Sequence, residues 1–243
     1  MNVLIPWIPS NWQEIIFSVR SIKRNYLDLD HIIIISETNP KVPGTIHFPY
    51  PDLEVGSKIN YMLLAEHMNR KIYKCVLDLG LTEFIYQNDD QYWLKPIKKN
   101  FFLNEQIWLE ELSTKQLIST QNSLLTNQKK NYWHWKLAVI DNLLFLKNKG
   151  KPCKNFATHM PSYLTRKDME QTLEFFGSWK FGRSAIYNLS KYFIDSKPKA
   201  NLIRKGFYNK NTDLSDISKY YFLSHDDLGL TPKLKDFLVS TFY

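Results

Sequence analysis

Short apolar runs alternate along this chain with longer segments in which apolar residues recur every three or four positions. The runs at 3–8 (VLIPWI) and 31–37 (HIIIISE) predict buried strands, and the second, rich in β-branched residues, is typical of a parallel strand. Between these two runs, the apolar residues of 12–27 recur at helical spacing and predict a helix. Asn11 and Glu14 stand at the approximate spacing of a capping box at its start. The chain therefore opens as a β-α-β unit of the kind found in nucleotide-binding sheets.

The pattern continues less regularly through the middle of the chain. TIHF (45–48) predicts one short strand within a loop, and 57–79 predicts a helix with a break near Asn69. EFIYQ (83–87) predicts a third buried strand. Residues 100–130 show no clear period, and we interpret them as a variable insert or strand pair followed by a mobile loop.

The remaining third of the chain returns to clear helical patterns. CKNFATHMP (153–161) is interpreted as a short strand and turn. Helices are expected at 133–146, from Thr165 to Phe176, at about 183–193, and at 233–242. No internal repeat and no linker interrupts this order, so we expect an α/β fold in a single domain over residues 1–243.

Two adjacent carboxylates end the third strand, in the stretch FIYQNDDQYWLKPI (84–97). Asn88, Asp89 and Asp90 would lie at the carboxyl end of a strand, which is where ligands collect in open α/β sheets. Like charges side by side need a cation, hydrogen bonds or open water. Hard divalent cations bind such oxygens and take further ligands from phosphate and water. The alternative is a solvated acidic pair at a turn.

Other residues are candidates for the same site, and each also has an ordinary structural explanation. His159 could be a metal ligand, a general base or a structural histidine. The segment 224–227 (SHDD) looks like a second site rim, although Asp226 could instead cap a turn. Lys58 opens a helix and could meet phosphate. The basic or aromatic runs at 132–136 and 204–210 could stack a sugar or base, or serve in packing and solvation.

Composition narrows the choice of partners. The chain has 243 residues, 44% of them hydrophobic, and a net charge of +8, which favours polyanionic partners but also fits a solvated lysine-rich surface. No run approaches the ~20 apolar residues of a membrane span. The N-terminus shows no secretory signal, and two cysteines make no disulfide framework. We therefore expect a cytoplasmic protein.

Taken in order, several blocks resemble glycosyltransferases of the GT-A nucleotide-diphospho-sugar fold, in particular the Stealth-type capsular sugar-phosphate transferases and small bacterial and phage relatives. The resemblance is carried, over about residues 3–97 and 131–240, by GSKINYMLLAEHM, EFIYQNDDQYWLKPI, NFATHMPSYLTRKDMEQTLEFF, GRSAIYN and FLSHDDLG. It implies a Rossmann-type mixed sheet flanked by helices. Residues 1–97 would bind the nucleotide sugar, 98–130 would be the variable insert, and 131–243 would form a helical and loop region on the acceptor side.

The resemblance also implies roles for individual residues. Asp90, with Asp89 or Asn88, would hold Mn²⁺ or Mg²⁺ and the donor diphosphate, although Asn88 stands where the family usually has aspartate. His159 would be a metal ligand or a catalytic group on the acceptor side. Basic residues near the donor phosphates would be Lys58 and Arg183, and Asp227 would deprotonate the acceptor hydroxyl.

The sequence therefore predicts a metal-dependent glycosyltransferase that uses a nucleotide sugar, most simply a UDP-sugar. The basic charge favours a hydroxymethylated base in phage DNA as the acceptor. A surface polysaccharide or glycan, glycosylated or modified with sugar phosphate, is the alternative. A non-catalytic nucleic-acid-binding protein is the competing class.

Overall fold

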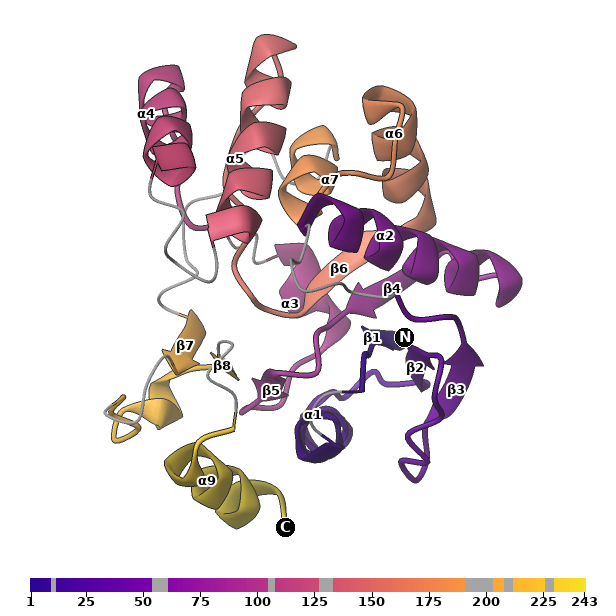
Figure 1. Cartoon of the computed structure of the whole chain (residues 1–243). Coiled ribbons are helices and arrows are strands. Elements are labelled where there is room, and N and C mark those ends of the chain that lie inside the picture. Colours follow the sequence, from indigo (N-terminus) through magenta and orange to yellow (C-terminus); the bar gives the residue numbers. More distant parts are fainter. Residues whose placement is uncertain are drawn as a thin grey trace.

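The computed structural model describes residues 1–9, 12–53, 61–104, 108–126, 133–190, 203–207, 212–225 and 230–243. Strands and helices alternate along most of this length (Figure 1). The strands are β1 (Val3–Pro6), β2 (Ile32–Ser36), β3 (Ile46–Pro49), β4 (Glu83–Tyr86), β5 (Gln91–Trp93), β6 (Ser162–Thr165), β7 (Arg204–Phe207) and β8 (Phe222–His225). The helices are α1 (Trp12–Asn25), α2 (Tyr61–Asp78), α3 (Lys99–Asn104), α4 (Thr114–Thr126), α5 (Trp133–Asn148), α6 (Arg166–Phe176), α7 (Arg183–Leu189) and α9 (Pro232–Phe242), with a 3₁₀ turn at Ile217–Lys219.

The central sheet has five strands in the order β3-β2-β1-β4-β6. The first four strands run parallel to one another, and β6 pairs antiparallel with β4. The opening β-α-β unit and the buried parallel strand at 31–37 are therefore confirmed. The structure confirms an α/β protein with a mixed sheet flanked by helices.

Alternate residues of the central strands pack into two apolar cores on opposite faces of the sheet. Leu4, Ile33 and Phe84 face α2, α5, α6 and α7, whereas Ile5 and Ile85 face α1 and α3. Figure 1 shows the larger group of helices on one side of the sheet and α1 on the other. Because both faces are covered, β1 and β2 are buried along their whole length, which explains why they are apolar runs rather than alternating sequences, whereas the edge strand β3 is partly exposed.

A second, smaller sheet lies beside the first, with the strand order β5-β8-β7. Only four residues separate β4 from β5, so the chain passes directly from one sheet to the other. Tyr92 and Leu223 of this sheet pack with Phe17 of α1 and with Leu234 and Leu238 of α9. The segment that carries the two aspartates is therefore the joint between the sheets.

Three sequence predictions about local structure are wrong. Helix α2 runs through Asn69 without a break, because the Asn69 side chain donates hydrogen bonds outward to the carbonyls of Trp179 and Phe181. The described part of 100–130 forms helices α3 and α4 and not a strand pair. In α4, Ser113 and Gln116 bond to each other as a capping box, and Leu117 is the buried residue.

The third error is the strand expected within 153–161, where the structure has only a single bridge between Lys154 and Glu111. Asn155 makes two backbone hydrogen bonds to residues 109–110, and side chains of α7 satisfy much of the remaining backbone. Asn188 accepts from the Lys154 amide and donates to the Lys154 carbonyl, and the Ser184 hydroxyl accepts from the Phe156 amide. The strand follows at 162–165, and the expected helices near 12–27, 133–146, 165–176 and 233–242 are confirmed. The helix expected at about 183–193 is present but ends at Leu189, and residues 191–193 lie outside the described residues.

The N-terminus of α6 offers a direct test of the link between sequence and structure. Thr165 Oγ1 accepts a hydrogen bond from the Asp168 amide (3.0 Å) and donates to the Asp168 carboxylate (2.6 Å). We expect Thr165→Ala to lower the free energy of unfolding by about 0.5–2 kcal/mol in urea denaturation, because the helix loses its cap. Thr126→Ala, at the exposed end of α4, is the control and should leave it nearly unchanged. Equal effects of both variants would contradict this assignment.

Candidate functional site

Asn88, Asp89 and Asp90 lie at the point where the strand order of the central sheet reverses. Strands β1, β2 and β3 follow one another outward on one side, whereas β4 lies on the other side of β1. In open α/β sheets, the crevice beyond the carboxyl ends of the strands at such a reversal is the usual ligand position. The predicted location of the acidic pair therefore agrees with the observed topology.

Two buried glutamines hold this turn from beneath. Gln87 Nε2 donates to Ser18 Oγ (2.6 Å) and to the Gln91 carbonyl (2.9 Å), and Gln87 Oε1 accepts from the Trp93 indole. Gln91 Oε1 accepts from the Asn88 amide at 3.3 Å. The turn is thus tied to α1 and to β5 by side chains that water does not reach.

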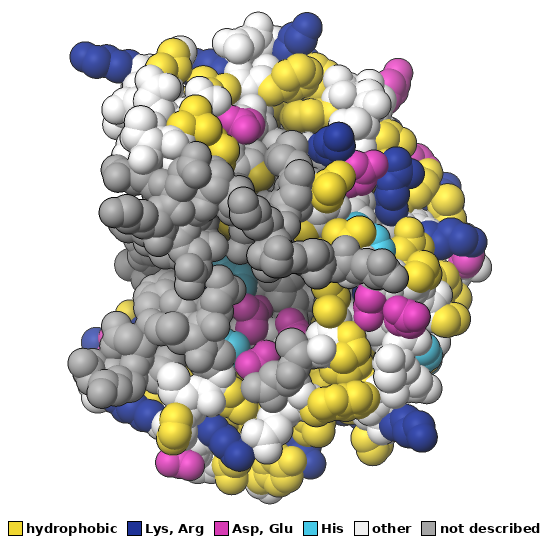
Figure 2. All heavy atoms as spheres, viewed as in Figure 1, with side chains coloured by type: hydrophobic (Ala, Val, Ile, Leu, Met, Phe, Trp, Pro, Cys, Tyr) yellow, Lys and Arg dark blue, Asp and Glu magenta, His cyan; other side chains and the backbone are white. Residues whose placement is uncertain are grey.

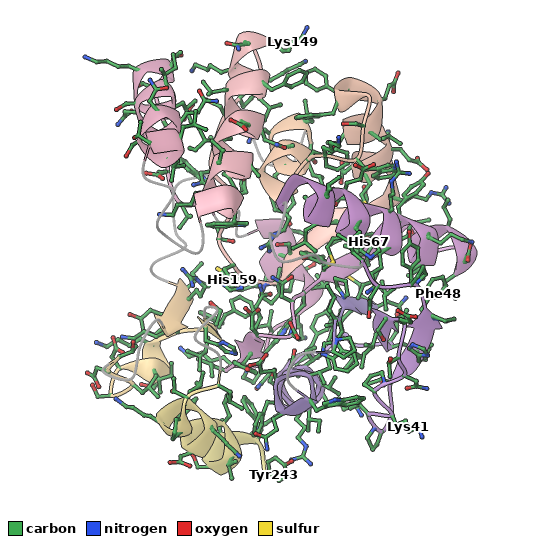
Figure 3. All side chains as sticks on the ribbon, viewed as in Figure 1. Lys41, Phe48, His67, Lys149, His159 and Tyr243 are labelled. Atoms are coloured by element: carbon green, nitrogen blue, oxygen red, sulfur yellow. The ribbon has the colours of Figure 1, made fainter. Side chains whose placement is uncertain are left out.

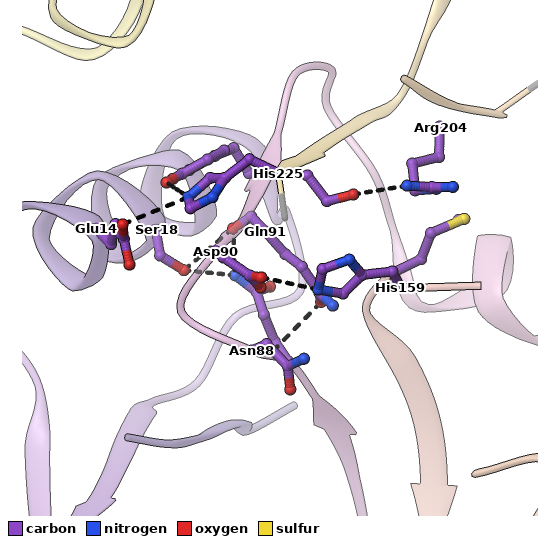
Figure 4. A network of polar contacts seen from close by, with 12 residues as sticks. Glu14, Ser18, Asn88, Asp90, Gln91, His159, Arg204 and His225 are labelled. Carbon is purple, nitrogen blue, oxygen red and sulfur yellow. Dashed lines mark hydrogen bonds and ion pairs between the residues drawn. The ribbon is translucent and has the colours of Figure 1, made fainter. Parts of the chain in front are cut away.

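Asp90 is paired with His159, as Figure 4 shows. His159 Nε2 lies 2.8 Å from Asp90 Oδ2, and both side chains remain partly exposed, 27% for His159 and 21% for Asp90. The His159 backbone is left-handed, with φ of 51°. This conformation costs a non-glycine residue roughly 1–2 kcal/mol, and such residues often mark functional positions. In this backbone conformation the His159 ring points at Asp90.

Arg183 builds the same turn. Its Nη1 donates to the Met160 carbonyl (2.6 Å) and to Ser162 Oγ (3.0 Å). Its guanidinium lies 5.2 Å from the Tyr86 ring centroid, and the Tyr86 hydroxyl donates to Asn88 Oδ1. Arg183 therefore belongs to the neighbourhood predicted for it, and its described contacts are with protein groups that shape the turn.

The two aspartates differ in their electrostatics. Burial, followed by the charges of Asp90 and Glu14, raises the pKa of Asp89 to about 8. Burial also acts to raise the pKa of Asp90, but the charge and hydrogen bond of His159 and the charge of His225 outweigh it and hold that pKa below its ordinary value. At neutral pH the ligand-free site therefore keeps Asp90 ionised and Asp89 largely protonated.

A third carboxylate, Glu14, joins this site from the first turn of α1. Its Oε1 lies 3.7 Å from Nε2 of the buried His225, whose backbone N–H donates to the Asp90 carbonyl at 3.3 Å (Figure 4). Sequence reasoning gave Glu14 only a helix-capping role, with Asn11, which lies outside the described residues. The signal available was its position just after the first strand, because that position lies beside the switch point.

The shape of the molecule agrees with a site here. Figure 2 shows acidic and histidine side chains together in a hollow near the middle of one face, whereas the Lys and Arg side chains lie toward the outline of the molecule. In Figure 3, His159 lies between the helical half of the molecule and the second sheet. The described side chains in the hollow are thus carboxylates and histidines, although the whole chain is basic.

The acidic pair offers oxygen ligands that suit a hard divalent cation, but it does not supply enough ligands to hold the ion by itself. Asp90 Oδ1 is buried and has no hydrogen-bond partner among the described residues, and Asp89 would ionise readily beside a cation. The same residues contain no group of three or more His, Cys, Asp or Glu side chains placed to hold one ion. Asp89, Asp90 and His159 are therefore not a ready-made three-ligand centre, and a bound ion would take most of its ligands from substrate and water.

The structure brings together five of the residues predicted for the site, namely Asn88, Asp89, Asp90, His159 and Arg183. Lys58 and Asp227 lie outside the described residues. In the run at 204–210, Lys205 pairs with Asp216 (2.8 Å), and the Arg204 guanidinium donates to Ser224 Oγ at 2.9 Å. Of the aromatic run at 132–136, Trp135 is exposed.

Two comparisons with known proteins identified no relative of this chain. No family model matches the sequence, and no curated protein matches it either. Across the described ranges, no helix combines the length and apolar character needed to cross a bilayer.

The raised pKa of Asp89 predicts a pH dependence of stability. The folded protein keeps this proton up to about pH 8, whereas the unfolded chain releases it near 3.8, so raising the pH through this window favours unfolding. We expect Asp89→Asn to remove this component, so that the melting temperature falls less steeply from pH 5 to 8 than in the wild type. The exposed Asp236→Asn is the control and should keep the wild-type slope in thermal unfolding followed by circular dichroism. An Asp89→Asn profile parallel to that of the wild type would contradict the shift.

Proposed function

We propose that this protein is a metal-dependent glycosyltransferase that moves a sugar from a nucleotide-sugar donor to a hydroxyl group. The observation that carries the proposal is the position of Asp89 and Asp90, at the point where the strand order β3-β2-β1-β4 reverses. Burial, together with carboxylate charge that the described residues only partly compensate, raises the pKa of Asp89 at this position. The antiparallel strand beside β4 and the resemblance of the sequence blocks to GT-A enzymes support the same class.

Asp89 and Asp90 are the residues that would hold Mn²⁺ or Mg²⁺. When bound, the ion supplies positive charge against the donor diphosphate, which leaves as the bond between the anomeric carbon and the phosphate oxygen breaks. His159 orients Asp90, and Arg183 braces the turn that carries His159. Gln87 and Gln91 hold the turn that carries the two aspartates while the donor binds and reacts.

The forming bond joins the acceptor oxygen to the anomeric carbon, and the acceptor proton needs a base. Asp227 is our first choice from the sequence resemblance. His159 is the second, because a neutral ring whose Nε2 donates to Asp90 leaves Nδ1 as the ring nitrogen that can accept a proton. A carboxylate that orients an imidazole is a recurrent device for this purpose.

The acceptor we propose is a hydroxymethylated base in DNA, which rests on the net charge of +8. The acidic hollow requires such a base to leave the stack and enter without its neighbouring phosphates. A glycan acceptor, which carries fewer phosphates, suits the hollow itself. A non-catalytic nucleic-acid-binding protein is less well supported, because the carboxylates of the hollow attract phosphate only through a bound cation.

The donor prediction is tested by incubating the protein with Mn²⁺ and a panel of nucleotide sugars. We expect hydrolysis or transfer with one donor class, dependent on the metal. We expect Asp90→Asn to lower the rate by about 100-fold or more, because it removes charge that would bind the ion and the diphosphate. Asp78→Asn, an exposed residue paired with Lys74 on α2, is the control and should keep full activity. Turnover that persists in Asp90→Asn, or no turnover of any donor by the wild type, would overturn the proposal.

The acceptor prediction needs a separate measurement. We expect the rate of nucleotide release to rise with DNA containing hydroxymethylcytosine and not with ordinary DNA of the same sequence. Mass spectrometry of the DNA should then show the added sugar. A rate that no DNA changes, together with glycosylation of an oligosaccharide, would assign the acceptor to glycans instead. An added mass of sugar phosphate would mark a phosphotransferase.

A further inference from the structure

A second histidine–carboxylate pair lies under the acidic turn, formed by Glu14 of α1 and His225 of β8. We infer that Glu14 and His225 are a positioning pair, which holds Asp90 at the joint between the two sheets in the geometry that binds the metal and the donor diphosphate. This inference rests on the proposed function of the site.

The contacts of His225 connect three parts of the protein at one ring. Its Nε2 is 3.1 Å from the Tyr92 hydroxyl and 3.7 Å from Glu14 Oε1. The ring stacks on Tyr92 with centroids 5.9 Å apart and an interplanar angle of 24°. Its backbone N–H donates to the Asp90 carbonyl. His225 therefore links Glu14 and Tyr92, through its ring, to Asp90, through its backbone N–H.

Apolar packing already joins these elements, so the pair is not needed to hold the fold together. Phe17 of α1 packs with Tyr92 and Leu223 of the second sheet in one core cluster. Glu14 and His225 are 7% and 2% exposed, and burying such a pair contributes little net stability compared with apolar residues of the same size. Its directional contacts specify instead where the end of β8, and with it Asp90, lies relative to α1.

Residues that support a metal-binding group from behind typically change affinity or activity by about 10- to 100-fold when they are removed. We expect Glu14→Ala to weaken Mn²⁺ binding in the presence of UDP by about that factor, and to lower kcat at saturating donor. Glu14→Gln keeps the length and hydrogen-bonding capacity of the side chain and should recover most of the loss. Electron paramagnetic resonance of Mn²⁺ measures the affinity without turnover.

Glu83→Ala is the matched control. Glu83 is also a partly buried carboxylate with a cationic partner, Lys99, and it accepts a hydrogen bond from Tyr163 (2.8 Å), but it starts β4 at the opposite end of the sheet from the acidic turn. Thermal unfolding of both variants separates stability from positioning. We expect the control to lose stability without losing affinity for Mn²⁺ and UDP.

The possible outcomes separate the two proposals. A wild type that neither binds Mn²⁺ with UDP nor turns over any donor overturns the proposed function and this inference with it. An active wild type whose Glu14→Ala variant binds normally, or loses no more affinity than Glu83→Ala, overturns the positioning role alone. If Glu14→Ala does not fold, His225→Phe takes its place, because it keeps a ring on Tyr92 and the backbone N–H but lacks Nε2. The same loss is then expected, and normal binding by His225→Phe overturns the inference.

Discussion

The structure depends on how carboxylate charge is accommodated at the joint between two sheets. Asp89, Asp90 and Glu14 meet there, and two histidines offset part of their charge. Asp90 stays ionised because His159 pairs with it, whereas Asp89 has no such ion pair among the described residues, and burial raises its pKa to about 8. A cation brought by a ligand would change this balance, because positive charge favours the ionised form of Asp89.

The scaffold around the acids explains how they are held against their mutual repulsion. Strand β4 belongs to one sheet and β5 to the other, so the turn between them cannot slide along either ladder. The amide side chains of Gln87 and Gln91 occupy the interior of this turn, and the αL backbone of His159 approaches it from the opposite side. Functional groups supported in this way by buried neighbours keep a defined geometry when a substrate binds.

Part of this site could be predicted because its signals are local. A β-branched run that ends in polar residues marks a strand end, and an acidic pair at such an end marks a ligand position. The partner of Asp90 was harder to predict. His159 could have been a ligand, a base or a core residue, and only its approach to the joint shows that it pairs with Asp90. Glu14 was missed because a helix-capping role was a sufficient explanation for it in the sequence.

The local errors have the same origin. The capping box of Ser113 and Gln116 was present in the sequence, but a helix with one buried residue, Leu117, has almost no apolar periodicity to reveal it. Residues 153–161 had the composition of a strand. Their backbone instead forms hydrogen bonds with the side chains of Asn188 and Ser184, which belong to a helix distant in the sequence. Tertiary partners decide such segments, because backbone groups need only to be satisfied and do not require a strand to do so.

The sequence by itself determined the α/β class, the order of the main strands and helices, and the placement of two aspartates at a strand end. Those properties follow from the spacing of apolar residues and from turn chemistry, which act over a few residues. Only the tertiary structure decided that β4 and β5 lie in different sheets, that His159 and Glu14 converge on the turn between them, and that Asp89 and Asp90 differ in charge. These features arise from contacts between residues far apart in the chain, and burial strengthens the interactions between their charges only after folding has brought them together.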